Sequence, residues 1–244
     1  MSVFQPYEII VGRSDSSASN ILIIADHASN CVPPGIDLGI APDELDKHIA
    51  IDIGVASVTR ALCATLGCGA VLAGVSRLVI DFNREEDSPG LIPTVSDGVV
   101  IPGNSDADAE ARLVAYYRPY HAAVTRTLDA IDRPFILSLH SFTPQLATRP
   151  EEQRPWDVGI LYNTDDRAAR LAIPMVGQAG LRVGDQLPYA GTVLNATMNL
   201  HAEARGLPYL GVEMRQDLVG DDAGARRMAE ALAPVLLHCS NRLA

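Results

Sequence analysis

Short apolar runs alternate with longer amphipathic segments along the chain, and this alternation constrains the fold most. The continuous, β-branched runs 21–25 and 135–139 predict buried strands, whereas 43–66 and 222–238 carry apolar residues at helical spacing. Strands that alternate with helices are typical of an α/β domain. We therefore expect one three-layer domain over residues 1–244, with a mixed, mostly parallel sheet between helices.

The other expected elements complete the same pattern. The sequence predicts further strands at 70–75, 78–82, 158–162, 181–183 and 208–212, and further helices at 105–131, 165–179 and 199–205. Two proline-containing segments, 85–104 and 143–155, show no clear period. Loops of this length are often functional lids or binding loops, and whether these two act as lids is left open.

Composition excludes several functional classes. The 244 residues include 19 Lys and Arg against 30 Asp and Glu, a net charge of −11, which disfavours binding to nucleic acid or to an anionic membrane. Four cysteines with no CxxC pair predict neither a disulfide framework nor a cysteine zinc site. No secretory signal or membrane-spanning run is evident, so we expect a cytoplasmic protein. The oligomeric state is left open.

Reactive polar residues follow several of the predicted strands. His27 follows 21–25, His140 follows 135–139, and Glu213 follows 208–212. In open α/β sheets, ligands bind outside the carboxyl ends of the strands. Asn83 and Arg84 likewise follow the strand expected at 78–82. The sequence therefore predicts that two imidazoles, a guanidinium and a carboxylate meet at one rim of the sheet.

His27 and His140 are the candidate metal ligands, because a neutral imidazole on a rigid strand end is a good zinc donor. A catalytic zinc site needs three protein ligands, and Asn30 is a candidate for the third. His48 and Asp52, which lie four residues apart on one helical face, are candidates for an alternative ligand or for a residue that supports one. Asp52 then either orients His48 or forms a simple helix salt bridge with it.

Glu213 is the candidate general base, since it ends an otherwise apolar strand and would lie beside a metal-bound water. The alternative is an ion pair with Arg215. Arg84 and Asn83 are candidates for binding a substrate carboxylate or carbonyl, because a guanidinium matches a carboxylate. The alternative for Arg84 is a surface pair with Glu85 or Glu86. GxSxG, GxGxxG, GxxxxGK[ST] and HExxH motifs are all absent.

Five blocks in order along the chain resemble the N-formylglutamate amidohydrolase family. They are Asp26–Pro33, His48–Gly54, Ser76–Arg84, Leu139–Phe142 and Gly206–Asp217. The resemblance implies a phosphorylase/hydrolase-like fold similar to that of zinc carboxypeptidases and aspartoacylases. It also implies zinc on His27 and His140, although Asn30 stands where the wider group has a glutamate.

The resemblance further implies a reaction and the roles of individual residues. Asn83 and Arg84 would hold the substrate, Glu213 would be the base, and the products would be formate and an amino acid, typically glutamate in histidine breakdown. An acidic N-acyl amino acid needs positive charge, for which the candidates are Arg77, Arg84, Arg149, Arg154 and Arg215, and Ser141 is a further candidate contact. A carboxypeptidase-type metallopeptidase and a non-catalytic ligand-binding domain are the alternatives.

Overall fold

A mixed seven-stranded sheet forms the centre of the computed structural model, which describes residues 5–193 and 195–244. In spatial order its strands are β1 (Tyr7–Ile10), β3 (Gly69–Ala73), β2 (Ile21–Ala25), β6 (Phe135–Phe142), β9 (Tyr209–Arg215), β7 (Val158–Leu161) and β8 (Val183–Asp185). β1 runs antiparallel to β3, and β7 runs antiparallel to β9. The other neighbours are parallel, which confirms the mostly parallel sheet that the sequence predicts.

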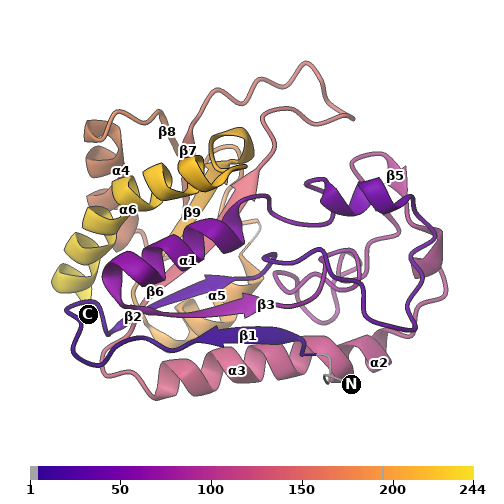
Figure 1. The fold of residues 1–244 in the computed structure, drawn as a ribbon, viewed down its shortest axis with the longest axis horizontal. Coiled ribbons are helices and arrows are strands. Elements are labelled where there is room, and N and C mark those ends of the chain that lie inside the picture. The colour runs from indigo at the N-terminus through magenta and orange to yellow at the C-terminus, as the bar shows by residue number, and fades with distance from the viewer. Residues whose placement is uncertain (1–4, 194) are drawn as a thin grey trace.

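Helices cover both faces of this sheet (Figure 1). α1 (Val55–Leu66), α4 (Arg167–Gln178) and α6 (Asp222–Leu243) lie on one face, and α3 (Arg118–Asp129) and α5 (Ala196–His201) lie on the other. Alternate residues of β2 divide accordingly: Ile21 and Ile23 pack with the first group, and Leu22 and Ile24 pack with the second. The predicted three layers are therefore present. No helix in the described residues is long and apolar enough to cross a membrane.

The helix expected over 43–66 is wrong in its first half. Only a short 3₁₀ turn, Pro42–Asp46, forms there, and α1 begins at Val55. Gly54 precedes α1 with φ of +84°, and a Cβ at this position would lie 2.3 Å from the Val219 carbonyl oxygen. The chain instead turns, and the Asp52 amide donates to the His27 carbonyl at 3.0 Å. This turn places Asp52 beside the end of β2.

The strand expected at 78–82 is also wrong. The segment is fully buried but forms turns, in which the Val79 and Ile80 amides donate to the Ser76 carbonyl. Two features escape the sequence patterns altogether. They are the partly exposed edge strand β1 and the hairpin of β4 (Val95–Ser96) and β5 (Val99–Val100), which lies inside the segment expected as a loop.

Several other elements differ from expectation in their bounds. The helix expected at 105–131 consists of α2 (Ala109–Arg112), a π-helical turn and α3, while the short strand begins at Val183 and α5 begins at Ala196. β6 and β9 run further than expected, to Phe142 and Arg215. His140 and Glu213 therefore lie inside paired strands, where the sheet holds them more rigidly than a loop would.

Candidate metal centre and active site

A cavity of about 180 Å³ opens at the carboxyl ends of β2, β6 and β9. Its position agrees with the rule that ligands bind at this edge of an α/β sheet. The lining residues combine imidazole, carboxylate and guanidinium groups: His27, His48, Asp52, Arg77, Asp81, Asn83, Arg84, His140, Ser141, Phe142, Thr143, Tyr189 and Glu213.

The register of the sheet places His140 and Glu213 side by side. They are directly paired between the parallel strands β6 and β9, so their side chains leave the same face of the sheet. His27 follows β2, the neighbour of β6 on the other side. Its ring centroid lies 5.0 Å from that of His140, so the two imidazoles meet as the sequence predicts.

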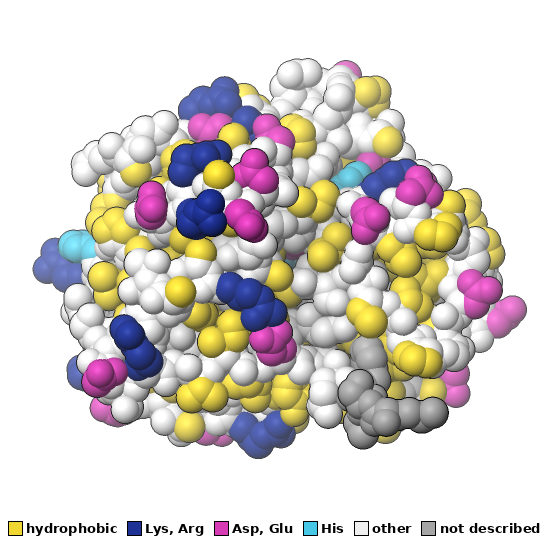
Figure 2. All heavy atoms as spheres, viewed as in Figure 1, with side chains coloured by type: hydrophobic (Ala, Val, Ile, Leu, Met, Phe, Trp, Pro, Cys, Tyr) yellow, Lys and Arg dark blue, Asp and Glu magenta, His cyan; other side chains and the backbone are white. Residues whose placement is uncertain are grey.

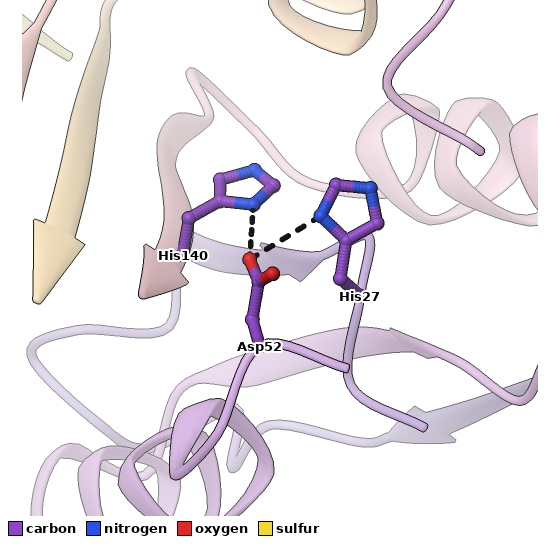
Figure 3. A group of neighbouring side chains, drawn as sticks. All are labelled: His27, Asp52 and His140. Atoms are coloured by element: carbon purple, nitrogen blue, oxygen red, sulfur yellow. Dashed lines mark hydrogen bonds and ion pairs between the residues drawn. The ribbon is translucent and has the colours of Figure 1, made fainter. Parts of the chain in front are cut away.

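Asp52 lies between the two imidazoles (Figure 3). Its Oδ2 is 3.2 Å from His27 Nδ1 and 2.9 Å from His140 Nδ1. One ligand atom from each of the three residues lies within 4.8 Å of the others, close enough to hold one metal ion, and all three side chains are buried. The turn before α1 is what brings this carboxylate into the site.

A second carboxylate supports each imidazole from behind. His27 Nε2 lies 2.7 Å from Asp81 Oδ1, and His140 Nε2 lies 3.4 Å from Asp26 Oδ2. The Tyr120 hydroxyl donates to the other oxygen of Asp26 at 2.7 Å. Carboxylates behind metal-bound histidines commonly fix the ring orientation and the tautomer.

The neighbouring carboxylates determine which nitrogen of the His27 ring carries a proton. A carboxylate accepts but does not donate, so Asp81 favours a proton on His27 Nε2 and leaves the Nδ1 lone pair facing Asp52. A lone pair and a carboxylate oxygen at 3.2 Å repel each other unless a cation or a second proton lies between them. Burial alone would lower the pKa of His27 and of His140, but the surrounding carboxylates raise both.

Arg77 ties two of these carboxylates together. One guanidinium nitrogen lies 3.0 Å from Asp52 Oδ1 and the other lies 2.9 Å from Asp81 Oδ2. Burial would raise the pKa of Asp52, yet His27, His140 and Arg77 lower it far below its usual range. Arg77, expected as a contact for substrate, therefore holds the carboxylates around His27 in place.

Glu213 is buried and Oε2 of its carboxylate has no hydrogen-bond partner among the described residues. Burial raises the pKa of Glu213 to about 7, although the nearby His140 acts in the opposite direction. Arg215, the alternative partner expected for Glu213, instead forms ion pairs with Asp217 and Asp157 and does not line the cavity. Glu213 is thus free to exchange a proton inside the cavity.

Arg84 and Asn83 lie at the cavity with donors to spare. The Arg84 guanidinium is 3.8 Å from Asp81 and makes no hydrogen bond within the described part of the chain. The Asn83 side-chain oxygen accepts from the Thr197 amide, which leaves its NH₂ group for other partners. Ser141 also lines the cavity, but its hydroxyl donates to the Ile53 carbonyl at 2.8 Å.

Two expected positions differ in the structure. Asn30 does not line the cavity, and its amide donates to Asp46 at 3.0 Å, whereas Asp52 lies with the two imidazoles. His48 lines the cavity but faces Asp97 of the β4–β5 hairpin at 3.0 Å rather than Asp52. The turn before α1 places Asp52, and the β4–β5 hairpin places Asp97 beside His48. Neither turn produces a helical or strand period in the sequence.

Sequence reasoning gave no role to several residues of the site. Asp26 and Asp81 each belong to a block that carries the resemblance, and a carboxylate beside a strand-end histidine is the signal that could have identified them. Tyr120 lies in a long helix, where the pattern marks it only as a core residue. Thr143 and Tyr189 reach the cavity through loops that have no periodic signal.

The residues present fit a divalent metal ion. Two imidazoles and one carboxylate form a donor set that zinc uses in catalytic sites with a fourth position open to water. Each imidazole has its carboxylate behind it. A bound cation would also relieve the repulsion between the Nδ1 lone pairs and the Asp52 oxygen that faces them.

A family model described as N-formylglutamate amidohydrolase matches residues 19–220, most of the chain. The chain belongs to this family. All the residues that form the cavity fall within the matched range. No curated protein sequence is significantly similar to the chain.

Two solved structures are similar over nearly the whole chain. A gene product of Agrobacterium tumefaciens is 29% identical with a TM-score of 0.88, and the match covers 98% of this chain and 96% of that one. N-formylglutamate amidohydrolase from Ralstonia eutropha is 20% identical with a TM-score of 0.71, and the match covers 98% of each chain. Both share the fold of this family member.

Proposed function

We propose that this family member is a zinc-dependent amidohydrolase that cleaves the N-acyl bond of a small N-acyl amino acid, with N-formylglutamate as the family's reference substrate. The observation that carries the proposal is the convergence of His27, Asp52 and His140 with an unpartnered Glu213 in one cavity. The volume of about 180 Å³ favours an amino-acid-sized substrate over a peptide.

His27, Asp52 and His140 would hold the ion. A divalent metal bound there supplies a Lewis acid that lowers the pKa of water and polarises the amide carbonyl. Asp81 and Asp26 keep the imidazoles oriented for this role, and Arg77 keeps Asp52 and Asp81 in place.

Glu213 moves the proton. With a pKa of about 7 its carboxylate accepts a proton from the attacking water at neutral pH and then delivers it to the leaving nitrogen. The C–N bond of the amide breaks, a C–O bond to the water oxygen forms, and formate and a free amino acid leave. Arg84 binds the substrate carboxylate, and the Asn83 NH₂ group donates to the acyl oxygen.

The test is formate release from a panel of N-formyl amino acids together with metal analysis of the same protein. His140→Ala should abolish hydrolysis and lower the bound metal. His238→Ala is the matched control, because His238 is exposed on α6 and distant from the cavity lining. Full activity of His140→Ala would contradict the proposal. Release of C-terminal residues from peptides would indicate a carboxypeptidase, and binding without turnover would indicate a non-catalytic domain.

A further inference from the structure

The positive charges around the cavity are almost all neutralised by the protein's own carboxylates. Arg77 lines the cavity but is paired with Asp52 and Asp81. On the face of the molecule in Figure 2, basic and acidic side chains also lie next to one another. A cationic side chain can therefore bind a substrate carboxylate only if it lines the cavity and is not already paired with a carboxylate of the protein.

Three of the five arginines that the sequence offers for an acidic substrate, Arg149, Arg154 and Arg215, do not line the cavity. Arg154 is buried, donates to the Tyr189 hydroxyl at 2.9 Å and pairs with Glu152 at 3.0 Å. Arg149 pairs with the other oxygen of Glu152 at 2.8 Å. Neither lines the cavity, and the same holds for Arg215, which is paired with Asp157 and Asp217.

His48 does not replace them. It lines the cavity, but the Asp97 carboxylate lies 3.0 Å from its Nε2, so any positive charge on the ring is already matched. Within the described ranges 5–193 and 195–244, Arg84 is then the one cavity-lining guanidinium without a hydrogen bond. One free guanidinium can bind one carboxylate in a bidentate manner.

The carboxylates around the cavity leave no surplus of positive charge. Asp26, Asp52, Asp81 and Glu213 surround the two imidazoles. Two arginines and one divalent cation would match these four charges when the imidazoles are neutral. A substrate with two carboxylates would add two negative charges to this balanced set, yet among the described residues only the Arg84 guanidinium lines the cavity without a hydrogen bond, so the second carboxylate would lack a partner.

We infer that this enzyme acts on N-acyl amino acids with a neutral side chain, whose single α-carboxylate pairs with Arg84, in preference to acidic ones. The inference rests on the proposed function, because it assigns the substrate of the same site. It differs from the acidic substrate expected from the sequence, and the difference arises because Arg77, Arg149, Arg154 and Arg215 are engaged by carboxylates.

The sharpest test uses an isosteric pair of substrates on the metal-loaded enzyme. N-formyl-L-glutamine and N-formyl-L-glutamate differ in one charge and hardly in shape. We expect kcat/KM for the glutamine compound to exceed that for the glutamate compound by about tenfold or more. A ratio of one or less would overturn the inference while leaving hydrolysis itself intact.

The variant Arg84→Gln shows which of the two carboxylates of an acidic substrate Arg84 binds. If Arg84 binds the α-carboxylate, this substitution lowers kcat/KM for both compounds by a similar factor. If only the glutamate compound is affected, Arg84 binds the side-chain carboxylate and the inference is wrong. Arg84→Lys, which keeps the charge but loses the two-pronged contact, should retain part of the activity.

Calorimetry keeps the inference testable even if hydrolysis fails. N-methyl-L-glutamine and N-methyl-L-glutamate carry no N-acyl bond, so their affinities for the metal-loaded protein do not depend on turnover. Tighter binding of the glutamine compound supports the inference, whereas equal or weaker binding, or no binding of either, overturns it. Absence of formate release from every N-formyl amino acid would instead refute the proposed function.

Discussion

The hydrogen bond from Tyr120 to Asp26 offers a clean test of how the site is supported. The Tyr120 hydroxyl donates to Asp26 Oδ1 at 2.7 Å, and both side chains are fully buried. The other oxygen, Asp26 Oδ2, has no hydrogen-bond partner among the residues that the structure describes and lies 3.4 Å from His140 Nε2. Tyr120→Phe therefore removes the main hydrogen bond to a buried carboxylate without leaving a cavity.

The expected cost follows from the charge on the acceptor. A hydrogen bond to a charged group contributes about 1.5–3 kcal/mol, so we expect Tyr120→Phe to lower the free energy of unfolding by about 2 kcal/mol. For a chain of this length that corresponds to a decrease in Tm of about 4–8 °C. Tyr117→Phe is the matched control, because its hydroxyl donates at 2.7 Å to the neutral Arg84 carbonyl. The control should cost about 1 kcal/mol.

The pH dependence distinguishes this explanation from general damage. Burial would raise the pKa of Asp26, but His140, His27 and Tyr120 lower it below its usual value. A lowered folded-state pKa stabilises the protein above the unfolded-state pKa of about 4, and this contribution is lost as the pH falls through the folded-state value. The cost of Tyr120→Phe should therefore shrink at low pH. Urea unfolding of metal-free protein at several pH values measures it. A cost no larger than that of Tyr117→Phe, or one independent of pH, would refute the reasoning.

Three further outcomes follow from the same geometry. Asp81→Asn should weaken metal binding roughly 10–100-fold, measured by competition with a chelator, because it removes the carboxylate behind His27. Burial raises the pKa of Glu213 to about 7, so kcat/KM should fall as the pH drops below about 7. Glu213→Gln should lower kcat/KM by roughly 10²–10⁴ and abolish this decrease at low pH. If the variant keeps the same decrease, Glu213 is not the base. Asp97 accepts hydrogen bonds from the Thr148 hydroxyl and from the Thr148 and Ala147 amides, and these, against the effect of burial, bring its pKa to about 2. Asp97→Ala should thus increase proteolysis of the 143–155 segment and destabilise the protein at pH 7, with a smaller effect as the pH approaches 2.

The parts of the fold that could be predicted are those whose pattern is set by burial. β2 and β6 are central strands with apolar residues on both faces, so their sequences leave little choice. The segment 78–82 is also largely apolar and buried, yet it forms turns. Apolar content alone does not distinguish a strand from a buried turn, since the difference lies in hydrogen bonds to distant residues such as Ser76.

Some residues of the site could likewise be predicted from the sequence, and others could not. His27, His140 and Glu213 could be predicted to converge, because they follow buried strands whose carboxyl ends share one edge of the sheet. Asp52 was expected as a partner of His48 or as an alternative ligand, but its position beside His27 was not expected, since the turn that places it there depends on Gly54 and its approach to Val219. A contact of this kind joins residues more than 150 positions apart and has no local signal.

The central claim is that one metal ion held by His27, Asp52 and His140 is needed for cleavage of the amide. The most direct measurement determines metal per chain and formate release on the same sample before chelation, after chelation and after zinc is restored. We predict about one ion per chain, loss of formate release when it is removed, and recovery in proportion to the zinc bound. Undiminished release from metal-free protein would contradict the account.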